Sequence, residues 1–518
     1  MKEIYPDLIK IRRQVFAEIA KLAYNDGNVY DLRQSIFRIL PGEFSEHRDN
    51  IFHERAIIGE RLRLALGLPV RSAKELTTLE DGIELVDVSH RVYQPPLVNV
   101  INFACMACPT KTVEITSNCR KCMGHPCINL CPVKAISFDK TQARIDKDKC
   151  IRCGRCLQNC PYHAIIKYDR PCASHCGVGA IESDEFGRAK INYDKCVSCG
   201  RCITECPFGA ISDKGQIYQL IRSIKEGNEV VAIVAPSFAG QFGPLAGPEE
   251  VFEGIRRLGF ADVAEVGLGA DLTTMHEAEE FVENVPSGNM PFMGTSCCNS
   301  WTLLVSKNFP ELIPYISGSA TPMIETAYYI KSKRPHAKVV FIGPCISKKL
   351  EALRDYVKDY VDFVITYEEL MGMFAAQDIE LADIEISGAL SDASRTARGY
   401  ARSGGVAGAV AEYIAENWPD ISVKAENVEG LENCAKLLKL AKAGKKNGML
   451  LEGMACEGGC IGGPGTLINL RKAENALHDY SKRSLYESPS QNYRLRSYEV
   501  DLADIQSRHA IAKSDMIE

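Results

Sequence analysis

The chain has 518 residues, of which 46% are hydrophobic and 25% charged, and its formal net charge is −6. This size allows two to four globular domains. The lack of a basic excess argues against nucleic acid as a partner, because nothing would offset phosphate repulsion. No apolar run is long enough to span a membrane, and the charged N-terminus lacks the apolar core of a signal peptide. These features predict a cytoplasmic protein with neither a membrane nor a nucleic-acid partner.

Cysteine is unusually frequent, with 22 copies. The cytoplasm keeps thiols reduced, so disulfides are not expected. Metal ligation is the alternative, and the spacing of the cysteines indicates the kind of metal site.

Residues 1–92 contain no cysteine and are predicted to form a helical N-terminal domain. A second helix, rich in arginine and glutamate, is expected over 51–68. We interpret the domain as a packing element; a docking surface for a redox partner is the alternative. The segment 93–96, Tyr-Gln-Pro-Pro, is typical of a linker. The first helix is indicated by apolar residues at helical spacing, namely Leu8, Ile11, Val15, Ile19 and Leu22.

Residues 93–212 contain a repeated cysteine motif. Cys150 and Cys196 lie 46 positions apart, as do Cys160 and Cys206, which predicts a tandem ferredoxin-like α+β domain. Both copies read Cys-x2-Cys-x2-Cys-x3-Cys-Pro, the bacterial ferredoxin signature for a 4Fe-4S cluster. Zinc is the alternative for any single CxxC pair, but quartets that end in Cys-Pro favour iron–sulfur clusters.

In this signature three neighbouring thiolates bind one cluster and the fourth thiolate reaches the adjacent cluster. A looser third copy of the motif precedes the other two. The predicted ligand sets are Cys119, Cys122, Cys127 and Cys160; Cys150, Cys153, Cys156 and Cys131; and Cys196, Cys199, Cys202 and Cys176. Four thiols remain, which either bind a fourth cluster or are merely buried: Cys105, Cys108, Cys172 and Cys206.

Residues 213–518 are predicted to form an α/β domain, because short apolar runs alternate with amphipathic segments. The expected strands are 230–234, 339–342, 361–365 and 449–451, and the expected helices include 250–258, 322–333 and 431–443. Functional-looking loops follow such runs at 235–237, 295–298, 343–349 and 452–460. Loops at the carboxyl ends of strands converge on one crevice in open α/β sheets, so these four are expected to form the walls of a single site.

Three of these loops contain cysteine motifs. They read TSCCNSW at 295–301, GPCISKKLE at 343–351 and EGMACEGGCIGG at 452–463. In these motifs, and over nearly its whole length, the chain resembles an iron-only (FeFe) hydrogenase. Asn299 and Gly343 resemble group B of that family. The resemblance implies the reaction 2H+ + 2e− ⇌ H2, with ferredoxin or flavodoxin as the electron carrier.

The resemblance also implies an H-cluster and its ligands. A 4Fe-4S cubane would be held by Cys298, Cys345, Cys456 and Cys460. Cys460 would bridge this cubane to a two-iron subcluster that carries CO, cyanide and an azadithiolate and that maturation proteins insert. Three to four accessory 4Fe-4S clusters would carry electrons to it.

By the same resemblance, Cys297 would exchange a proton with the azadithiolate, in a pocket of low dielectric that can bring its pKa near the operating pH. The onward relay would be Glu280, Ser317 and Glu277. Glu277 and Glu280 are three residues apart, so they would share one helix face. On sequence alone, a solvated surface pair of glutamates is the alternative.

The remaining predicted site residues surround the two-iron unit. Lys348 would donate to a cyanide, and Met454 would form an apolar wall that excludes water. Pro236 and Ser237, with Ala235, match a loop that contacts the other cyanide.

Two residues depart from the family pattern. Gly343 stands in place of a methionine, which is expected to remove one wall of the pocket, and Asn299 replaces a proline and adds a hydrogen-bonding side chain near the cubane. Cys434 belongs to no quartet and is interpreted as a free thiol, packed or exposed. His175 is an alternative cubane ligand.

No dinucleotide fingerprint is present in the sequence, which favours a protein electron carrier over NAD(P)H. Two functions other than catalysis remain open. One is a hydrogen sensor with the same site and a weakened proton path. The other is an iron–sulfur assembly protein that lacks the two-iron subcluster.

Overall fold

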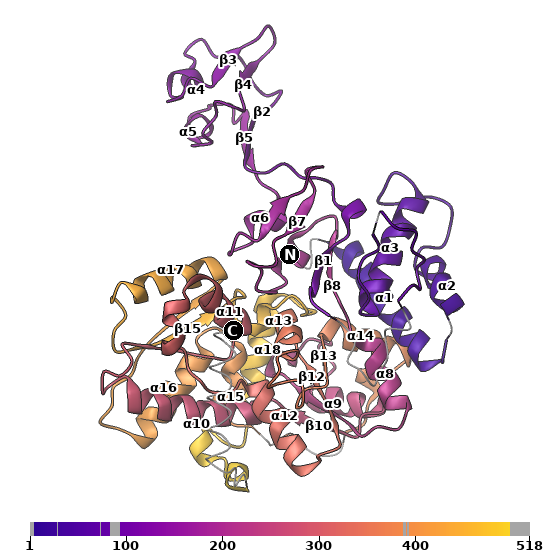
Figure 1. The fold of residues 1–518 in the computed structure, drawn as a ribbon, viewed down its shortest axis with the longest axis vertical. Coiled ribbons are helices and arrows are strands. Elements are labelled where there is room, and N and C mark those ends of the chain that lie inside the picture. Colours follow the sequence, from indigo (N-terminus) through magenta and orange to yellow (C-terminus); the bar gives the residue numbers. More distant parts are fainter. Residues whose placement is uncertain are drawn as a thin grey trace.

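In the computed structural model (Figure 1), the N-terminal part of the chain forms three helices, α1 (Pro6–Tyr24), α2 (Val29–Ile39) and α3 (Ile51–Ala65). A proline begins α1, where its fixed φ suits a helix start, and the Asn50 side chain caps α3 by accepting the N–H of His53 at 2.9 Å. The helix expected over 51–68 ends at Ala65, three residues before its expected end. The described residues are 5–27, 29–72, 74–82, 94–386, 390 and 393–497, so Tyr93 of the expected linker lies outside them.

The N-terminal helices share a hydrophobic core with the C-terminal part of the chain. Helix α1 packs against α8 (Ile217–Lys225) and α14 (Tyr367–Ala376). Val15 and Ile19 of α1 belong to the same buried cluster as Val230. The domain boundaries at 92/93 and 212/213 stay predictions.

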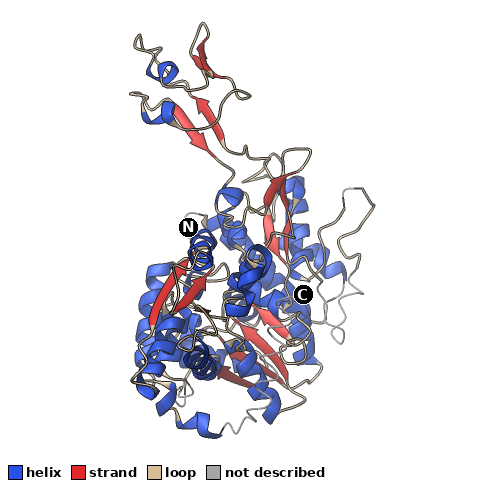
Figure 2. Cartoon of the chain, turned by 60° about the vertical axis from the view of Figure 1, so that its left-hand side comes forward, coloured by secondary structure: helices blue, strands red, loops and turns tan. Residues whose placement is uncertain are grey.

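The two iron–sulfur modules are nested rather than consecutive. The inner module is residues 112–168, which we call the arm. Its strands β2 (Thr112–Ile115) and β5 (Ile165–Tyr168) pair antiparallel at its base, and β3 pairs with β4 in the same way. The arm projects from the rest of the molecule, which we call the body (Figures 1 and 2). Its other elements are β3 (Ile136–Phe138), β4 (Ala143–Ile145), α4 (Pro126–Asn129) and α5 (Arg155–Gln158).

The outer module is built from segments on both sides of the arm. Strand β1 pairs antiparallel with β8, and β6 pairs antiparallel with β7. Helices α6 and α7 lie side by side. The bounds are β1 (Val98–Val100), α6 (Pro171–Ser174), β6 (Ile181–Ser183), β7 (Ala189–Ile191), α7 (Arg201–Glu205) and β8 (Ile211–Asp213).

The C-terminal part contains two parallel sheets. The first has the strand order β10-β9-β12-β13, and its central strand β9 is wholly buried, as its continuous apolar sequence predicts. Helices α9, α12 and α13 pack against it. The bounds are β9 (Val230–Val234), α9 (Pro248–Arg257), β10 (Asp262–Glu265), α12 (Pro322–Lys333), β12 (Lys338–Ile342), α13 (Ile346–Glu351) and β13 (Phe363–Ile365).

The second parallel sheet has the strand order β11-β15-β14. Helices α11, α16 and α17 pack against β15, and α10 contacts both α12 and α16. The bounds are α10 (Gly267–Asn284), β11 (Met293–Gly294), α11 (Asn299–Asn308), α15 (Arg395–Arg398), α16 (Gly405–Asn417), β14 (Lys424–Glu429), α17 (Leu431–Lys442), β15 (Met449–Met454) and α18 (Leu470–Lys482).

Helices surround both sheets in Figure 2. The predicted fold class is confirmed: helices at the N-terminus, small iron–sulfur modules, and a larger α/β part. The four functional loops follow strands of two different sheets, because β9 and β12 belong to one sheet while β11 and β15 belong to the other. Among the described residues, no helix has the length and apolar character that crossing a membrane requires.

Candidate functional site

Four thiols from three loops, which follow strands of both sheets, lie close together. Cys298 follows β11, Cys345 follows β12, and Cys456 and Cys460 follow β15. Burial, then the nearby Cys298, raises the pKa of Cys345 to about 11. Burial also raises the pKa values of Cys456 and Cys460, and the nearby thiols Cys345 and Cys298 raise each of them further. The structure thus places the four predicted cubane ligands, all partly buried, close to one another.

Trp301 fixes the first loop against the third. Its indole is fully buried, and its Nε1–H donates to the carbonyl of Thr295 at 3.1 Å. A Cβ on Gly453 would lie 2.1 Å from the indole ring, so only glycine fits at this point of β15. The tryptophan of the first motif and the glycine of the third motif are therefore a packing pair that holds Cys298 and Cys456 in register.

Cys297 lies in a pocket with two buried carboxyl groups. Burial raises the pKa of its thiol well above the ordinary value, and Glu277 and Glu452 raise it further. The thiol alone therefore does not titrate near neutral pH, contrary to expectation. Burial raises the pKa of Glu277 to about 8, although its Oε1 accepts the N–H of Ser296 at 2.8 Å and its hydroxyl at 3.0 Å. Glu277 Oε2 is buried and has no hydrogen-bond partner among the described residues.

Glu280 lies further out on the same face of α10. Its carboxylate accepts the hydroxyl of Ser317 at 2.7 Å and the N–H of Gly318 at 3.0 Å. Glu280 is half-buried, whereas Glu277 is fully buried beside the Cys297 loop. The structure therefore orders the residues as Cys297, Glu277, then Ser317 with Glu280, and the order expected from the resemblance is reversed.

Sequence reasoning missed two residues of this pocket. Glu452 is fully buried and accepts the N–H groups of Gly404 and Ala407, both at 2.8 Å, at the start of α16. Burial raises its pKa to about 7. Tyr400 packs with Cys297 and Met454, and its hydroxyl contacts that of Thr274 at 2.8 Å. Glu452 carries a signal, because a glutamate interrupts an apolar strand; Tyr400 carries none.

The two adjacent lysines of the second motif have different partners. Lys348 Nζ lies 2.6 Å from a Glu351 carboxylate oxygen and donates to Thr321 Oγ1 at 3.0 Å. Burial lowers its pKa, but Glu351 outweighs this effect and the net shift is upward, so Lys348 is a fixed cation beside Cys345. Lys349 points instead into the core.

The predicted loop at 235–237 and Met454 complete the walls. The Ser237 hydroxyl contacts the Tyr367 hydroxyl at 2.7 Å, and Tyr367 donates to the carbonyl of Ala235 at 3.1 Å. Pro236 begins a short 3-10 turn and is buried. Met454 is buried in one cluster with Cys297. Tyr367, which orients Ser237, was not identified from the sequence.

The two departures from the family pattern have distinct structural roles. A Cβ at Gly343 would lie 2.5 Å from the Phe341 ring, so this ring fills the space beside the glycine. Asn299 Nδ2 donates to the carbonyl of Ser347 at 2.9 Å and to its hydroxyl at 2.8 Å, joining the first and second loops. Ser300 and Ser347 both donate to the carbonyl of Val197.

Val197 lies between Cys196 and Cys199 of the third predicted ligand set, which borders the four-thiol site. Within this set, Cys202 is close enough to Cys199, Cys196 and Cys176 for each to raise its pKa. Cys199 in turn is close to Cys345, and Cys456 is close to Cys199. The third thiol set and the four-thiol site are thus adjacent.

Two further thiol sets line cavities of their own. One cavity is lined by Cys119, Cys122, Cys127 and Cys160, and another by Cys105, Cys108, Cys172 and Cys206. These are the first set and the four leftover thiols, so the leftover thiols do come together. They do so although residues 109–171, which include the arm, separate Cys108 from Cys172. In the second set, Cys156 lies near Cys150 and Cys153, and it shares a buried cluster with Cys131.

Two cysteine-region residues lie outside these sets. Cys434 is fully buried under β15, so it is a packed thiol rather than an exposed one. His175 Nδ1 lies 2.9 Å from the carbonyl of Pro171, and its Nε2 lies 3.6 Å from Glu205, so both ring nitrogens already face protein groups.

Two buried arginines flank the Cys105, Cys108, Cys172 and Cys206 set. Arg170 donates to the carbonyls of Cys108, Glu182 and Gly187. Arg61 donates to the carbonyl of Gly209 at 2.5 Å, and its Nε is unpartnered within the described part of the chain. Burial, then repulsion from Arg12, lowers the pKa of Arg61 to about 10, so it remains a cation at neutral pH.

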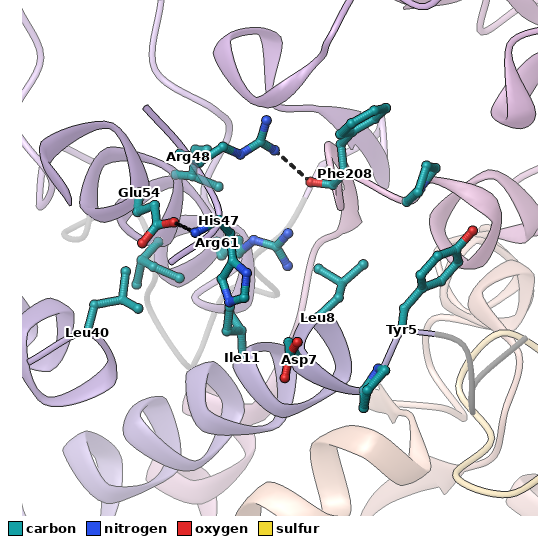
Figure 3. A pocket seen from close by; sticks show the side chains of 14 residues that line it. Tyr5, Asp7, Leu8, Ile11, Leu40, His47, Arg48, Glu54, Arg61 and Phe208 are labelled. Atoms are coloured by element: carbon teal, nitrogen blue, oxygen red, sulfur yellow. Dashed lines mark hydrogen bonds between the residues drawn. The ribbon is translucent and has the colours of Figure 1, made fainter. Parts of the chain in front are cut away.

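Figure 3 shows Arg61 at a pocket beside Arg48, which donates to the carbonyl of Phe208 at 3.0 Å. A buried cation needs a nearby anion. Cys206 lies close enough to Arg61 to influence the pKa of the arginine. Thiolates at the Cys105, Cys108, Cys172 and Cys206 set would therefore supply the negative charge that Arg61 needs. Neither arginine was identified from the sequence.

The donor set fits iron–sulfur clusters. In the described part of the chain, no three His, Cys, Asp or Glu side chains converge tightly enough to hold a single metal ion. Thiols that surround a shared space, accompanied by buried cations, suit a larger anionic cluster. Fold and thiol sets together define an iron–sulfur protein with several cluster sites.

Comparisons with known proteins agree with this class. Residues 228–464 match the family described as iron only hydrogenase large subunit, C-terminal domain. Residues 117–169 match an LdpA Fe-S cluster-binding domain, and residues 189–212 match a 4Fe-4S binding domain. Residues 228–464 therefore belong to the iron-only hydrogenase family. The assignment to group B stays a prediction.

Among curated proteins, iron hydrogenase 1 of Clostridium pasteurianum is 30% identical over 372 residues, which cover 62% of this chain and 64% of that protein, just under two thirds of its length. The periplasmic Fe hydrogenase large subunit of Nitratidesulfovibrio vulgaris is 28% identical over 399 residues, 66% of this chain and 91% of that protein. A shorter match, 30% identical over 130 residues, is to the cytosolic Fe-S cluster assembly factor NAR1 of Meyerozyma guilliermondii and covers 23% of this chain and 24% of that protein.

Proposed function

We propose that the chain is a cytoplasmic FeFe hydrogenase that catalyses 2H+ + 2e− ⇌ H2. The observation that carries the proposal is that four partly buried thiols lie close to Cys297, Lys348 and Glu277. Cys298, Cys345, Cys456 and Cys460 would hold the cubane, and Cys460 would also bind the two-iron subcluster. That subcluster, inserted by maturation proteins, would supply the site at which protons and electrons combine.

The residues of this chain would bind, orient and move protons around that group. Cys297 keeps its proton at neutral pH and so can donate this proton. Glu277, whose pKa lies near 8, can then supply a new proton to the Cys297 thiolate. Ser317 and Glu280 would connect Glu277 to the half-buried side of α10. Lys348 would offer a largely buried cation to a charged ligand, and Met454 would exclude water.

The thiol sets outside the pocket would hold three to four accessory 4Fe-4S clusters. The Cys176, Cys196, Cys199 and Cys202 set borders the four-thiol site and would be the last step inward. Ferredoxin or flavodoxin would exchange electrons with the outer sets. The cavity formed by the four leftover thiols favours four accessory clusters over three.

The alternative is an iron–sulfur assembly protein, which the match to NAR1 supports. Cys297 distinguishes the two functions, because a cubane carrier needs no proton donor beside it. We expect Cys297→Ala to reduce H2 evolution by reduced dye about 10²-fold or more, with the iron content unchanged. Cys434→Ala, a buried thiol outside every set, is the matched control. Equal activity of the two variants would contradict the proposal.

A further inference from the structure

The arm stands clear of the body. Its helices and strands pack against one another, and none of them makes an extensive contact with an element outside the arm (Figure 1). Two chain segments, before β2 and after β5, connect it to the outer module. Nearly all of its surface is therefore open to another protein.

The arm and the body carry opposite charge. Residues 112–168 contain ten Lys and Arg and four Asp and Glu, a formal net charge of +6 before any cluster is counted. The whole chain carries −6, so the remainder carries −12. All ten basic side chains are exposed. Three of them pair with acidic residues of the arm, whereas within the described residues Arg120, Arg152 and Arg155 form no ion pair.

The unpaired arginines and two exposed apolar residues stand next to predicted cluster ligands along the chain. Met123 is 93% exposed next to Cys122, and Ile151 is 61% exposed next to Cys150. Of the 22 cysteines, all of which are described, Cys153 alone is exposed. Apolar residues accompanied by polar ones are the usual composition of a transient protein interface, and here exposed apolar and cationic residues flank ligands of both predicted clusters of the arm.

We propose that the arm is the docking site of a small acidic electron-carrier protein. The inference rests on the proposed function and names the surface on which its carrier lands. The body's negative charge repels an acidic carrier and the arm's positive charge attracts it, so encounters are steered to the arm. One electron then passes from the reduced carrier, which is oxidised, to a cluster held by the arm's thiols, which is reduced; no proton or bond is exchanged.

The test measures cluster reduction without H2. An acidic bacterial ferredoxin, reduced in advance, is mixed with the oxidised holoprotein, and the second-order rate of cluster reduction is followed by stopped-flow absorption. We expect the rate to fall as salt is added. Arg120→Glu combined with Arg155→Glu should lower the rate at low salt by about tenfold or more and flatten its salt dependence.

The matched control reverses two exposed cations of the body, Arg471 and Lys472, by Arg471→Glu with Lys472→Glu. This control makes the same change in net charge and should keep the parent rate. The inference is overturned if both double variants slow the reaction equally, or if neither does. It is also overturned if the arm variant keeps its rate but loses binding to anionic phospholipid vesicles, which would make the arm a lipid-binding surface. If the clusters are reduced at the normal rate but the protein turns over no H2, the hydrogenase proposal is refuted and the docking proposal still stands.

Discussion

A proton moving along the proposed pathway from solvent to the four-thiol site passes side chains that differ in burial. Glu280 is half-buried and hydrogen-bonded, Glu277 is fully buried with a pKa near 8, and the pKa of Cys297 lies well above its usual value. Burial is the main cause of both shifts, because a low dielectric disfavours the charged form of each group. At neutral pH Glu277 and Cys297 are therefore mostly protonated, so both can donate a proton.

Glu277→Gln tests this pathway. Gln cannot pass on a proton, so we expect H2 evolution to fall about 10²-fold. In the parent protein the evolution rate should decline as pH rises through about 8, where Glu277 loses its proton. The Gln variant should lack this decline. Glu279→Gln, an exposed neighbour on the same helix, is the control. Equal pH profiles for the parent protein and Glu277→Gln would exclude Glu277 from the pathway.

Arg61 is expected to tune the reduction potential of the cluster beside it. A buried cation stabilises the more negative, reduced form of a neighbouring cluster. We expect Arg61→Gln to lower the midpoint potential of the cluster at Cys105, Cys108, Cys172 and Cys206 by roughly tens of millivolts, since charge tunes such potentials. Arg61→Lys keeps the charge and should retain most of the potential. An EPR-monitored redox titration measures both, and an unchanged potential in the Gln variant would refute the role.

At the scale of elements, Lys349 joins three parts of the fold. It is fully buried, with Nζ at 2.9 Å from carboxylate oxygens of both Asp213, at the end of β8, and Glu369, in α14. Glu369 also forms a capping box with Thr366 at the start of α14. One side chain of α13 thereby ties the outer iron–sulfur module to the first parallel sheet.

We expect Lys349→Met to destabilise the protein by about 3–5 kcal/mol, because two buried carboxylates lose their counter-charge. The shift of the urea unfolding midpoint measures this loss. Lys358→Met removes an exposed ion pair with Asp355 and should cost no more than about 1 kcal/mol. Similar midpoints for the two variants would contradict the role of Lys349.

Sequence periodicity predicted most of the strands but not every end. The strand expected over 449–451 continues to Met454, because the carboxylate of Glu452 accepts N–H groups at the start of α16 and so tolerates burial in β15. The division of the functional loops between two sheets was not predictable, because strand pairing depends on contacts between distant segments. For the same reason Arg61, Arg170 and Tyr400 were missed.

At the scale of the whole molecule, the insertion of one iron–sulfur module into the other determines which thiol sets lie side by side. The repeat predicted two modules in succession, whereas the structure inserts one between Cys108 and Cys172 of the other. As a result the leftover thiols lie beside the third set, where Cys172 influences Cys202, and the third set lies beside Cys345 and Cys456. The thiol sets of the body thus form a continuous path to the site, with the arm at its outer end.

The four-thiol site is proposed to hold a two-iron unit with diatomic ligands and to turn over H2. Infrared spectroscopy of anaerobically matured protein, together with H2 uptake by a dye acceptor, tests it most directly. We predict bands of metal-bound CO and cyanide, accompanied by turnover. Bands with negligible turnover would indicate a hydrogen sensor. The absence of bands after exposure to competent maturation proteins would contradict the hydrogenase function and leave an electron-transfer or assembly role.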